Sequence, residues 1–448
     1  MSKVLLISPP SWGLMLPMTT PAPPPPLGLV LLKRVLENDG HDVLLLDTGV
    51  CTVDLIGIRQ IIKTYKPDIV GITTYFQNLS IYHIAKSARE VLHEVLIVVG
   101  GCIATKCAHE ILALGEKVFD VIIRGEGIEP LRILADIGGD RKKLSELDIF
   151  DQVNGVYCSK LDSKNSVYSG DLYLGMVSPA IYKQIHYVFN SGCPFKCSFC
   201  IHSGNLNDME FDVKSIVDEI IKINEVYGNE LFMLFDETTT YCKSRILRFA
   251  ELMKRCNNDL HFWCGTRIDC LDEEIINALC EIGVKRIFIG TETTDPQTQK
   301  YIGNKCCDMN KVRRVIKCLK SYGMKIETSV LLGLPFEKRE TFLRSIQDCM
   351  EMGIENIMFN VLSILPSTEL YRNCENLGYK KLGEASCLEE FFNQSLYQVN
   401  GNKFFRDLYI EPEEFPEIIQ ETLKILDYDN FDGRQISFKK KVIFRLPY

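Results

Sequence analysis

The chain has 448 residues, and its 51 lysines and arginines against 59 aspartates and glutamates give a formal net charge of −8. This length suits two or three domains, and a composition of 46% hydrophobic and 25% charged residues is typical of a globular protein in water. The negative charge argues against nucleic acid as a partner. No run of about 18 apolar residues is present, so we expect neither a membrane-spanning helix nor a membrane partner.

The cysteine usage and the N-terminus indicate the cellular compartment. The N-terminal residues enter an apolar strand at once and lack the small-residue cleavage site of a signal peptide. Most of the 18 cysteines, such as Cys158 and Cys349, stand singly among apolar residues, which predicts packing rather than disulfides. We therefore expect a reducing, cytoplasmic location.

The first part of the chain alternates short apolar strands with helical patterns. The expected strands are residues 3–8, 42–47, 69–74, 95–101 and 119–127. Continuous apolar strands separated by helices predict a parallel sheet that is covered on both faces. The fold class is therefore α/β, with a doubly wound N-terminal domain (flavodoxin-like or Rossmann-like) over residues 1–140, followed by a linker over 141–180.

Domains of this kind bind ligands at the carboxyl ends of their strands. Here these ends are 9–13, 73–78, 100–102 and 125–127, which are rich in glycine, proline and hydroxyl groups. Glycine lets a ligand approach the backbone closely, but turns between strands and helices also require it. The composition alone leaves both interpretations open.

A second alternating region spans residues 181–370. Six strands are expected at 185–190, 231–236, 261–269, 286–292, 325–335 and 357–366, with helices between them. Six β/α units predict a partial (β/α)6 barrel, whose active site lies at the carboxyl ends of the strands. Residues 371–448 mix helical and extended pieces, and we expect a small α+β region that closes one side and lines the substrate pocket.

Three cysteines follow the first barrel strand at the spacing C-x3-C-x2-C: Cys193, Cys197 and Cys200. A short loop can wrap three thiolates around one iron–sulfur cube, which leaves the fourth iron open to a small molecule. The alternative is a structural zinc site with His202 as the fourth ligand, but zinc sites favour paired C-x2-C units and this loop has one.

The cysteine motif resembles that of the radical S-adenosylmethionine (SAM) superfamily. The resemblance implies a [4Fe–4S] cluster on the three cysteines, SAM on the fourth iron, and reductive cleavage of SAM to a 5′-deoxyadenosyl radical. An electron donor such as flavodoxin or ferredoxin is then a partner. The implied SAM-binding residues, at or near strand ends, are Phe199, Asp236, Glu237, Arg267, Glu292 and Gly333. Each carboxylate or arginine alone could equally belong to an ordinary salt bridge.

Two turns depart from the family pattern. The segment after Gly333 resembles the family's Gly-Leu-Pro-Gly-Glu turn with Phe336 in place of the second glycine. The end of the sixth strand resembles Pro-x-Pro-Gly-Thr-x-Leu-Tyr, with Ser367 in place of glycine.

A doubly wound domain before such a barrel resembles the cobalamin-binding radical SAM enzymes, over roughly residues 1–370. The resemblance implies a cobalamin site formed by Pro10, Thr73, Thr74, Gly100, Gly101, Gly125 and Glu126. No Asp-x-His-x-x-Gly motif is present, so we expect no histidine ligand to cobalt.

The resemblance predicts a methyltransferase that acts on an unactivated carbon of a small molecule or peptide. One SAM would methylate cobalamin to methylcobalamin, and the radical from a second SAM would activate the substrate. The alternatives are a radical SAM enzyme for cyclisation, dehydration, epimerisation or rearrangement, and a non-catalytic iron–sulfur or zinc protein.

Overall fold

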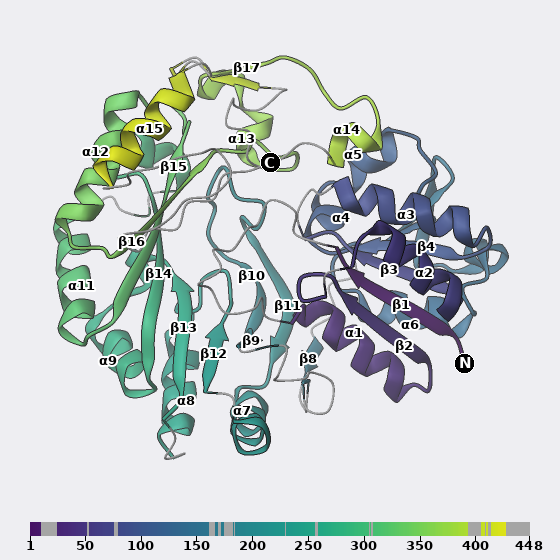
Figure 1. Ribbon diagram of the computed structural model, residues 1–448. Coiled ribbons are helices and arrows are strands. Elements are labelled where there is room, and N and C mark those ends of the chain that lie inside the picture. The colour runs from purple at the N-terminus through teal and green to yellow at the C-terminus, as the bar shows by residue number, and fades with distance from the viewer. Residues whose placement is uncertain are drawn as a thin grey trace.

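The computed structural model describes residues 1–9, 25–51, 53–75, 79–160, 166–168, 172–173, 182, 184–228, 230–255, 259–303, 305, 308–392, 405–407, 409–410 and 414–426. Two α/β bodies lie side by side, one formed by the first half of the chain and the other by the second (Figure 1). Within the described residues, none of the helices is long and apolar enough to cross a membrane.

The first body is built on a seven-stranded sheet in the order β2-β1-β3-β4-β5-β7-β6. Its five parallel strands confirm the predicted doubly wound domain: β1 (Lys3–Ser8), β2 (Asp42–Asp47), β3 (Ile69–Thr73), β4 (Leu96–Gly100) and β5 (Val121–Ile122). Neighbouring residues of β1 face opposite layers, since Leu5 packs in one core cluster and Leu6 in another. This arrangement explains why the strands are apolar at every position.

Helices cover both faces of this sheet. On the face of Leu6 lie α1 (Leu27–Asn38) and α6 (Ile128–Asp136), which contact each other. The face of Leu5 is covered by α2 (Leu55–Tyr65), α3 (Leu79–Val91), α4 (Cys102–Lys106) and α5 (Ala108–Ala113).

A hairpin from the stretch predicted as linker extends the first sheet. After the short helix η1 (Arg141–Glu146), strands β6 (Phe150–Val153) and β7 (Val156–Ser159) pair with each other, and β7 pairs parallel with β5. The exact boundaries of the domains remain a prediction.

The second body is a six-stranded parallel sheet in the order β16-β15-β14-β13-β12-β9. The partial barrel predicted from the sequence is confirmed by these strands: β9 (Ile185–Tyr187), β12 (Leu231–Leu234), β13 (His261–Thr266), β14 (Val284–Glu292), β15 (Lys325–Leu332) and β16 (Asn356–Val361). The connecting helices are α7 (Val213–Tyr227), α8 (Lys243–Lys254), η2 (Ile268–Cys270), α9 (Glu273–Glu281), α10 (Pro296–Ile302), α11 (Met309–Ser321) and α12 (Arg339–Glu351).

A small three-stranded sheet lies beside the barrel. It pairs β10 (Asn190–Cys193) antiparallel with β11 (Asn205–Phe211), and β11 parallel with β8 (Ser166–Tyr168). The loop between β10 and β11 carries the cysteine motif, so the motif is presented by a hairpin rather than by an open loop.

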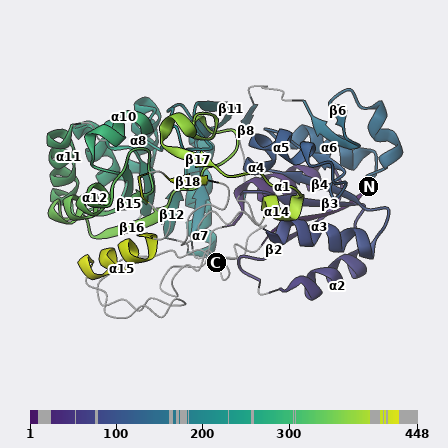
Figure 2. The ribbon, with the colours of Figure 1, turned by 90° about the horizontal axis from the view of Figure 1, so that it is seen from above.

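The region after the barrel reaches both bodies. It contains α13 (Glu369–Arg372), η3 (Glu375–Leu377), β17 (Tyr379–Lys381), α14 (Leu388–Phe392), β18 (Phe405–Asp407) and α15 (Phe415–Ile425). Figure 2 shows α15 beside α12 and α14 beside the first body. The Phe392 ring packs edge-on against Phe119, with the centroids 5.9 Å apart, and Glu116 accepts a hydrogen bond of 2.8 Å from the Leu388 backbone.

Candidate functional site

The cysteine loop is closed by backbone hydrogen bonds. Cys193, at the end of β10, pairs with Asn205 at the start of β11. Within the loop, the Cys200 amide donates to the Cys197 carbonyl at 3.1 Å, and the Gly204 amide donates to Phe195 at 2.8 Å. These bonds fix the backbone that carries the three cysteines.

A polar side chain contacts each of two of the three thiols. Cys193 and Cys197 are buried, and Arg267 Nη1 lies 3.3 Å from Cys197 Sγ, while Thr238 Oγ1 lies 3.7 Å from Cys193 Sγ. Burial raises the pKa of the Cys197 thiol, and the cations Lys305 and Arg267 oppose that rise. Their positive charge favours a thiolate, which is the form that binds iron.

Arg267 follows β13 and is fixed by three contacts. Its guanidinium binds the Asp269 carboxylate with two hydrogen bonds of 2.9 and 2.7 Å and lies 4.0 Å from the centre of the Phe195 ring. The structure thus places this predicted SAM-binding residue against the cysteine loop itself. These three contacts hold the guanidinium in one orientation beside Cys197.

Glu292, at the end of β14, belongs to a buried charged group that includes a residue the sequence reasoning missed. Lys305 forms an ion pair with Glu292 Oε1 at 2.7 Å, and the Ser329 hydroxyl donates to Oε2 at 2.7 Å. The Lys305 ammonium also lies 5.5 Å from the ring centre of Phe199. Burial lowers the pKa of Lys305, but the Glu292 carboxylate outweighs it, so the pKa is raised.

The two acidic residues after β12 have different surroundings. Asp236 is buried, and its Oδ1 accepts a 3.0 Å hydrogen bond from the Phe189 amide, which ties it to the barrel backbone. Glu237 is more exposed and lies 3.3 Å from His202 Nδ1; His202 Nε2 lies in turn 3.8 Å from Cys102 Sγ of the first body. Glu237 and His202 therefore stand where the two bodies meet.

The turn after β15 is held by its own acidic residue. The Gly333 amide donates to Glu337 Oε2 at 2.8 Å, and the Tyr379 hydroxyl donates to the Gly333 carbonyl at 2.7 Å. Phe336 has φ 61° and Ser367 has φ 69°, both in the left-handed region. Both positions thus keep the backbone conformation that favours the glycine of the family pattern.

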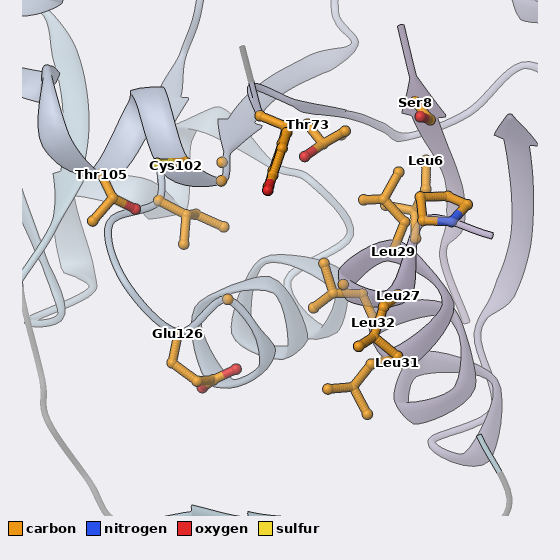
Figure 3. Close-up of a pocket in the computed structure, with 18 of the residues that line it drawn as sticks. Leu6, Ser8, Leu27, Leu29, Leu31, Leu32, Thr73, Cys102, Thr105 and Glu126 are labelled. Carbon is orange, nitrogen blue, oxygen red and sulfur yellow. The ribbon is translucent and has the colours of Figure 1, made fainter. Parts of the chain in front are cut away.

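One cavity of about 850 Å³ lies between the two bodies. From the first body Thr73, Gly100, Gly101, Gly125 and Glu126 line it, and from the second His186, Gly192, His202, Phe235 and Glu237 do so. Figure 3 shows leucines of α1 and Leu6 on one side of this space, with Thr73, Cys102, Thr105 and Glu126 around the rest. Five of the seven predicted cobalamin residues thus meet in one cavity.

The other two predicted cobalamin residues are Thr74 and Pro10. Thr74 is not among the lining residues: it is fully buried and its hydroxyl donates to the Gly100 carbonyl at 2.7 Å, which shapes the turn after β4. Pro10 lies outside the described residues.

The residues of the two sites fit the [4Fe–4S] cluster and the cobalamin that the family resemblance implies. Within the described part of the chain, no three His, Cys, Asp or Glu side chains converge on a single metal ion, and His202 contacts Glu237 and Cys102 instead. In a [4Fe–4S] cluster each thiolate binds a different iron. Backbone exposed at Gly100 and Gly101 gives a large ligand close access to the first sheet.

Two protein families match the chain, one in each body. The B12 binding domain family matches residues 18–135, and the Radical SAM superfamily matches residues 187–349. The chain is a cobalamin-binding radical SAM protein. Its cofactors are accordingly a [4Fe–4S] cluster, SAM and cobalamin.

Relatives of this radical SAM protein share both bodies. An uncharacterized methyltransferase from Pyrococcus horikoshii is 26% identical over 381 residues, which cover 82% of each chain. The anaerobic magnesium-protoporphyrin IX monomethyl ester cyclase of Rubrivivax gelatinosus is 27% identical over 372 residues, which cover 78% of this chain and 66% of the cyclase.

Among solved structures, the radical SAM methyltransferase TsrM from Kitasatospora setae, with cobalamin and a [4Fe–4S] cluster bound, superposes with a TM-score of 0.70 at 15% identity. The match covers 98% of this chain and 93% of that protein. At this identity the likeness shows that the two proteins share a fold.

Proposed function

We propose that this protein is a cobalamin-dependent methyltransferase that acts on an unactivated carbon of a small molecule or peptide. When bound, the cluster and SAM supply the 5′-deoxyadenosyl radical, and cobalamin supplies the methyl group. The observation that carries the proposal is the cavity lined by both bodies, since it would bring the two cofactor sites to one substrate.

The chain's own residues would divide the work. Cys193, Cys197 and Cys200 would hold the cluster, and Arg267 would keep the Cys197 thiolate in place. The Glu292–Lys305 pair, beside Phe199, would offer one negative and one positive group to SAM, whose amino-acid part carries both charges.

Methyl transfer is favoured over the alternatives by the relatives. Two of the three similar proteins described above are named as methyltransferases, and the one from Pyrococcus horikoshii matches 82% of each chain. The similarity to the cyclase leaves ring formation as the competing reaction. We further propose a low-potential electron donor such as flavodoxin or ferredoxin, and a cytoplasmic location.

Loading of the methyl group can be tested without knowing the substrate. The anaerobically reconstituted protein would be incubated with hydroxocobalamin, titanium(III) citrate and SAM, and the cobalamin extracted in the dark for chromatography. We expect methylcobalamin and S-adenosylhomocysteine in equal amounts, and faster than in the same mixture without protein. No acceleration over the protein-free mixture would contradict methyl transfer.

The substrate step separates the competing reactions. With SAM deuterated in its methyl group and small-molecule extracts as substrate source, mass spectrometry should find the label in a product. A product that forms with 5′-deoxyadenosine but carries no label would instead support cyclisation, dehydration, epimerisation or rearrangement.

A further inference from the structure

A second cavity, of about 580 Å³, opens on the first body beside the one between the bodies. It is lined by α4, α5, the end of β5 and the β6–β7 hairpin. The two cavities share a wall, because Thr105, Lys106 and Arg124 line both. This shared wall is not used by any of the cofactor contacts proposed above.

The second cavity carries positive charge. Among the described residues that line it, the charged ones are Lys106 and Arg124, joined by His109, and none is an aspartate or glutamate. Across the described residues, no ion pair joins Lys106 or Arg124 to a carboxylate. Elsewhere in the same body, Arg89 and Arg141 share Asp120. Two neighbouring cations without a counter-charge are unusual, because partial burial of a charge is costly unless it is paired.

The backbone of Arg124 is fixed, while its guanidinium keeps an unsatisfied hydrogen-bond donor among the described residues. Its amide donates to Ser159 Oγ at 2.7 Å, which anchors the backbone to β7. Its Nε is buried and has no hydrogen-bond partner within the described part of the chain. The guanidinium contacts the Cys158 thiol, a weak acceptor. The Arg124 guanidinium therefore lacks a strong acceptor among the described residues.

Lys106 brings the second charge to the same wall from the end of α4. Burial lowers its pKa, and the charged forms of the nearby Cys102, Cys200 and Cys107 thiols oppose that shift. Lys106 also lines the larger cavity, to which His202 of the cysteine loop contributes from the second body. A ligand that reaches Lys106 therefore also reaches the space between cobalamin and SAM.

The carboxylates of the large cavity are engaged elsewhere. Glu126 accepts a hydrogen bond from the Ile128 amide in its own turn, and Glu237 lies beside His202. Within the described residues, neither forms an ion pair with Lys106 or Arg124.

We propose that Lys106 and Arg124 form an anion-binding subsite that takes a phosphate group. The planar fork of arginine and the mobile ammonium of lysine together suit the several oxygens of a phosphate. Two ligands could bring this group: a phosphorylated substrate, or cobalamin through the phosphodiester of its nucleotide tail.

Isothermal titration calorimetry with inorganic pyrophosphate tests the subsite directly. The full chain, with its cluster reconstituted but without SAM or cobalamin, should bind pyrophosphate at constant ionic strength. Lys106→Gln should weaken this binding about tenfold or more, since it removes a charge-assisted hydrogen bond. Arg124→Lys, which keeps the charge but loses the fork, should weaken it less.

Lys63→Gln is the matched control, because it removes the same charge from α2 at an exposed position that lines neither cavity. The thermal midpoint of each variant shows whether it is folded. If wild-type protein does not bind pyrophosphate, or if folded Lys106→Gln protein binds it as tightly as the Lys63→Gln control, the proposal is wrong. The assay involves no methyl transfer, so its outcome is independent of the proposed function.

Cobinamide, which lacks the nucleotide tail and its phosphate, identifies the source of the anion. If Lys106→Gln weakens cobalamin binding but not cobinamide binding, and pyrophosphate competes with cobalamin, then the subsite holds the cofactor's phosphate. If the variant binds both corrinoids as wild type but loses pyrophosphate, the subsite belongs to the substrate. Either result supports the subsite.

Discussion

The two bodies build their candidate cofactor sites on different principles. The barrel wall, meaning the residues around the cysteine loop, has fixed charges, such as Arg267 tethered to Asp269 and Glu292 paired with Lys305. The wall of the first body is formed by exposed backbone at glycines such as Gly100 and by leucines of α1 (Figure 3). A small, charged ligand such as SAM is held by preorganised polar groups, whereas a large corrinoid is held by shape and close backbone approach.

The backbone conformations show the same contrast. Near the barrel wall the left-handed region is occupied by Glu292, Phe336 and Ser367, which carry side chains, while the first wall uses Gly101 and Gly125. A non-glycine residue in this region is strained. At these positions the barrel tolerates strain to place side chains, whereas the two first-body turns at the cavity use glycine and leave space.

The largest effect is expected from removing the cluster ligands. Replacing Cys193, Cys197 and Cys200 with alanine should abolish iron and sulfide binding and 5′-deoxyadenosine formation, because no thiolate remains to hold the cluster. Cobalamin binding should persist, since we expect that cofactor on the first body, whose sheet has its own core. The iron, sulfide and cobalamin contents after anaerobic reconstitution check both parts of this prediction. Loss of cobalamin together with iron would show that the walls are not independent.

The complementary change places a bulky side chain on the wall of the first body. Gly100→Trp should prevent cobalamin binding while the cluster assembles normally, because a Cβ there makes only ordinary contact, 3.8 Å from Ile123, and the ring would enter the cavity. Gly101 is a poorer position for this test, since its φ of 98° and a Cβ 3.0 Å from Thr73 Oγ1 would strain the fold itself. Thr64→Trp, on the exposed surface of α2, is the control. Equilibrium dialysis with hydroxocobalamin measures the effect, and stoichiometric binding to Gly100→Trp would place the corrin elsewhere.

A buried charge on the barrel wall should be costly to leave unpaired. Lys305→Met isolates the Glu292 carboxylate and should reduce stability by about 3–5 kcal/mol, while the double variant Lys305→Met/Glu292→Leu should recover much of that loss. Denaturation followed by fluorescence of Trp263 in β13 measures it in a Trp12→Phe background, where Trp263 is the sole remaining tryptophan.

The exposed pair of Arg248 with Glu251 gives the comparison, because Arg248→Met should cost less than about 1 kcal/mol. If Lys305→Met and Arg248→Met lowered the free energy of unfolding equally, the Glu292–Lys305 pair would not be the rigid element that the comparison of the walls requires.

The smallest effect should come from relieving backbone strain. Ser367→Gly should stabilise the protein by about 1 kcal/mol, since glycine adopts φ 69° without steric penalty. Ser244→Gly, in the first turn of α8, should instead destabilise by about 0.5 kcal/mol. Chemical denaturation of both variants gives the difference, and a loss of stability in Ser367→Gly would show that the contacts of the serine side chain outweigh its strain.

The sequence was most informative where burial is complete. Strands buried on both faces read as continuous apolar runs, so the five parallel strands and the six barrel strands could be predicted with their order along the chain. The cysteine motif was found because its spacing is local.

Long-range contacts could not be found in the same way. Lys305 is thirteen positions from Glu292, and no periodic pattern connects them. The contact of His202 with Cys102 depends on how the two bodies dock. The β6–β7 hairpin did have a local signal, since Asn154 and Gly155 both have positive φ and form a tight hairpin turn, but its pairing with β5 had none.

Helix α14 gives the chain an order of assembly in time. Leu388, Phe391 and Phe392 pack into the core of the first body, on the face of α3, although they follow the whole barrel in sequence. During synthesis the last strand of the first sheet, which ends at Ser159, leaves the ribosome long before Leu388 does. At ordinary translation rates the interval is roughly ten to fifty seconds. The first body therefore waits with part of its core open to solvent until the barrel has been made, and completing that core also fastens the two halves together.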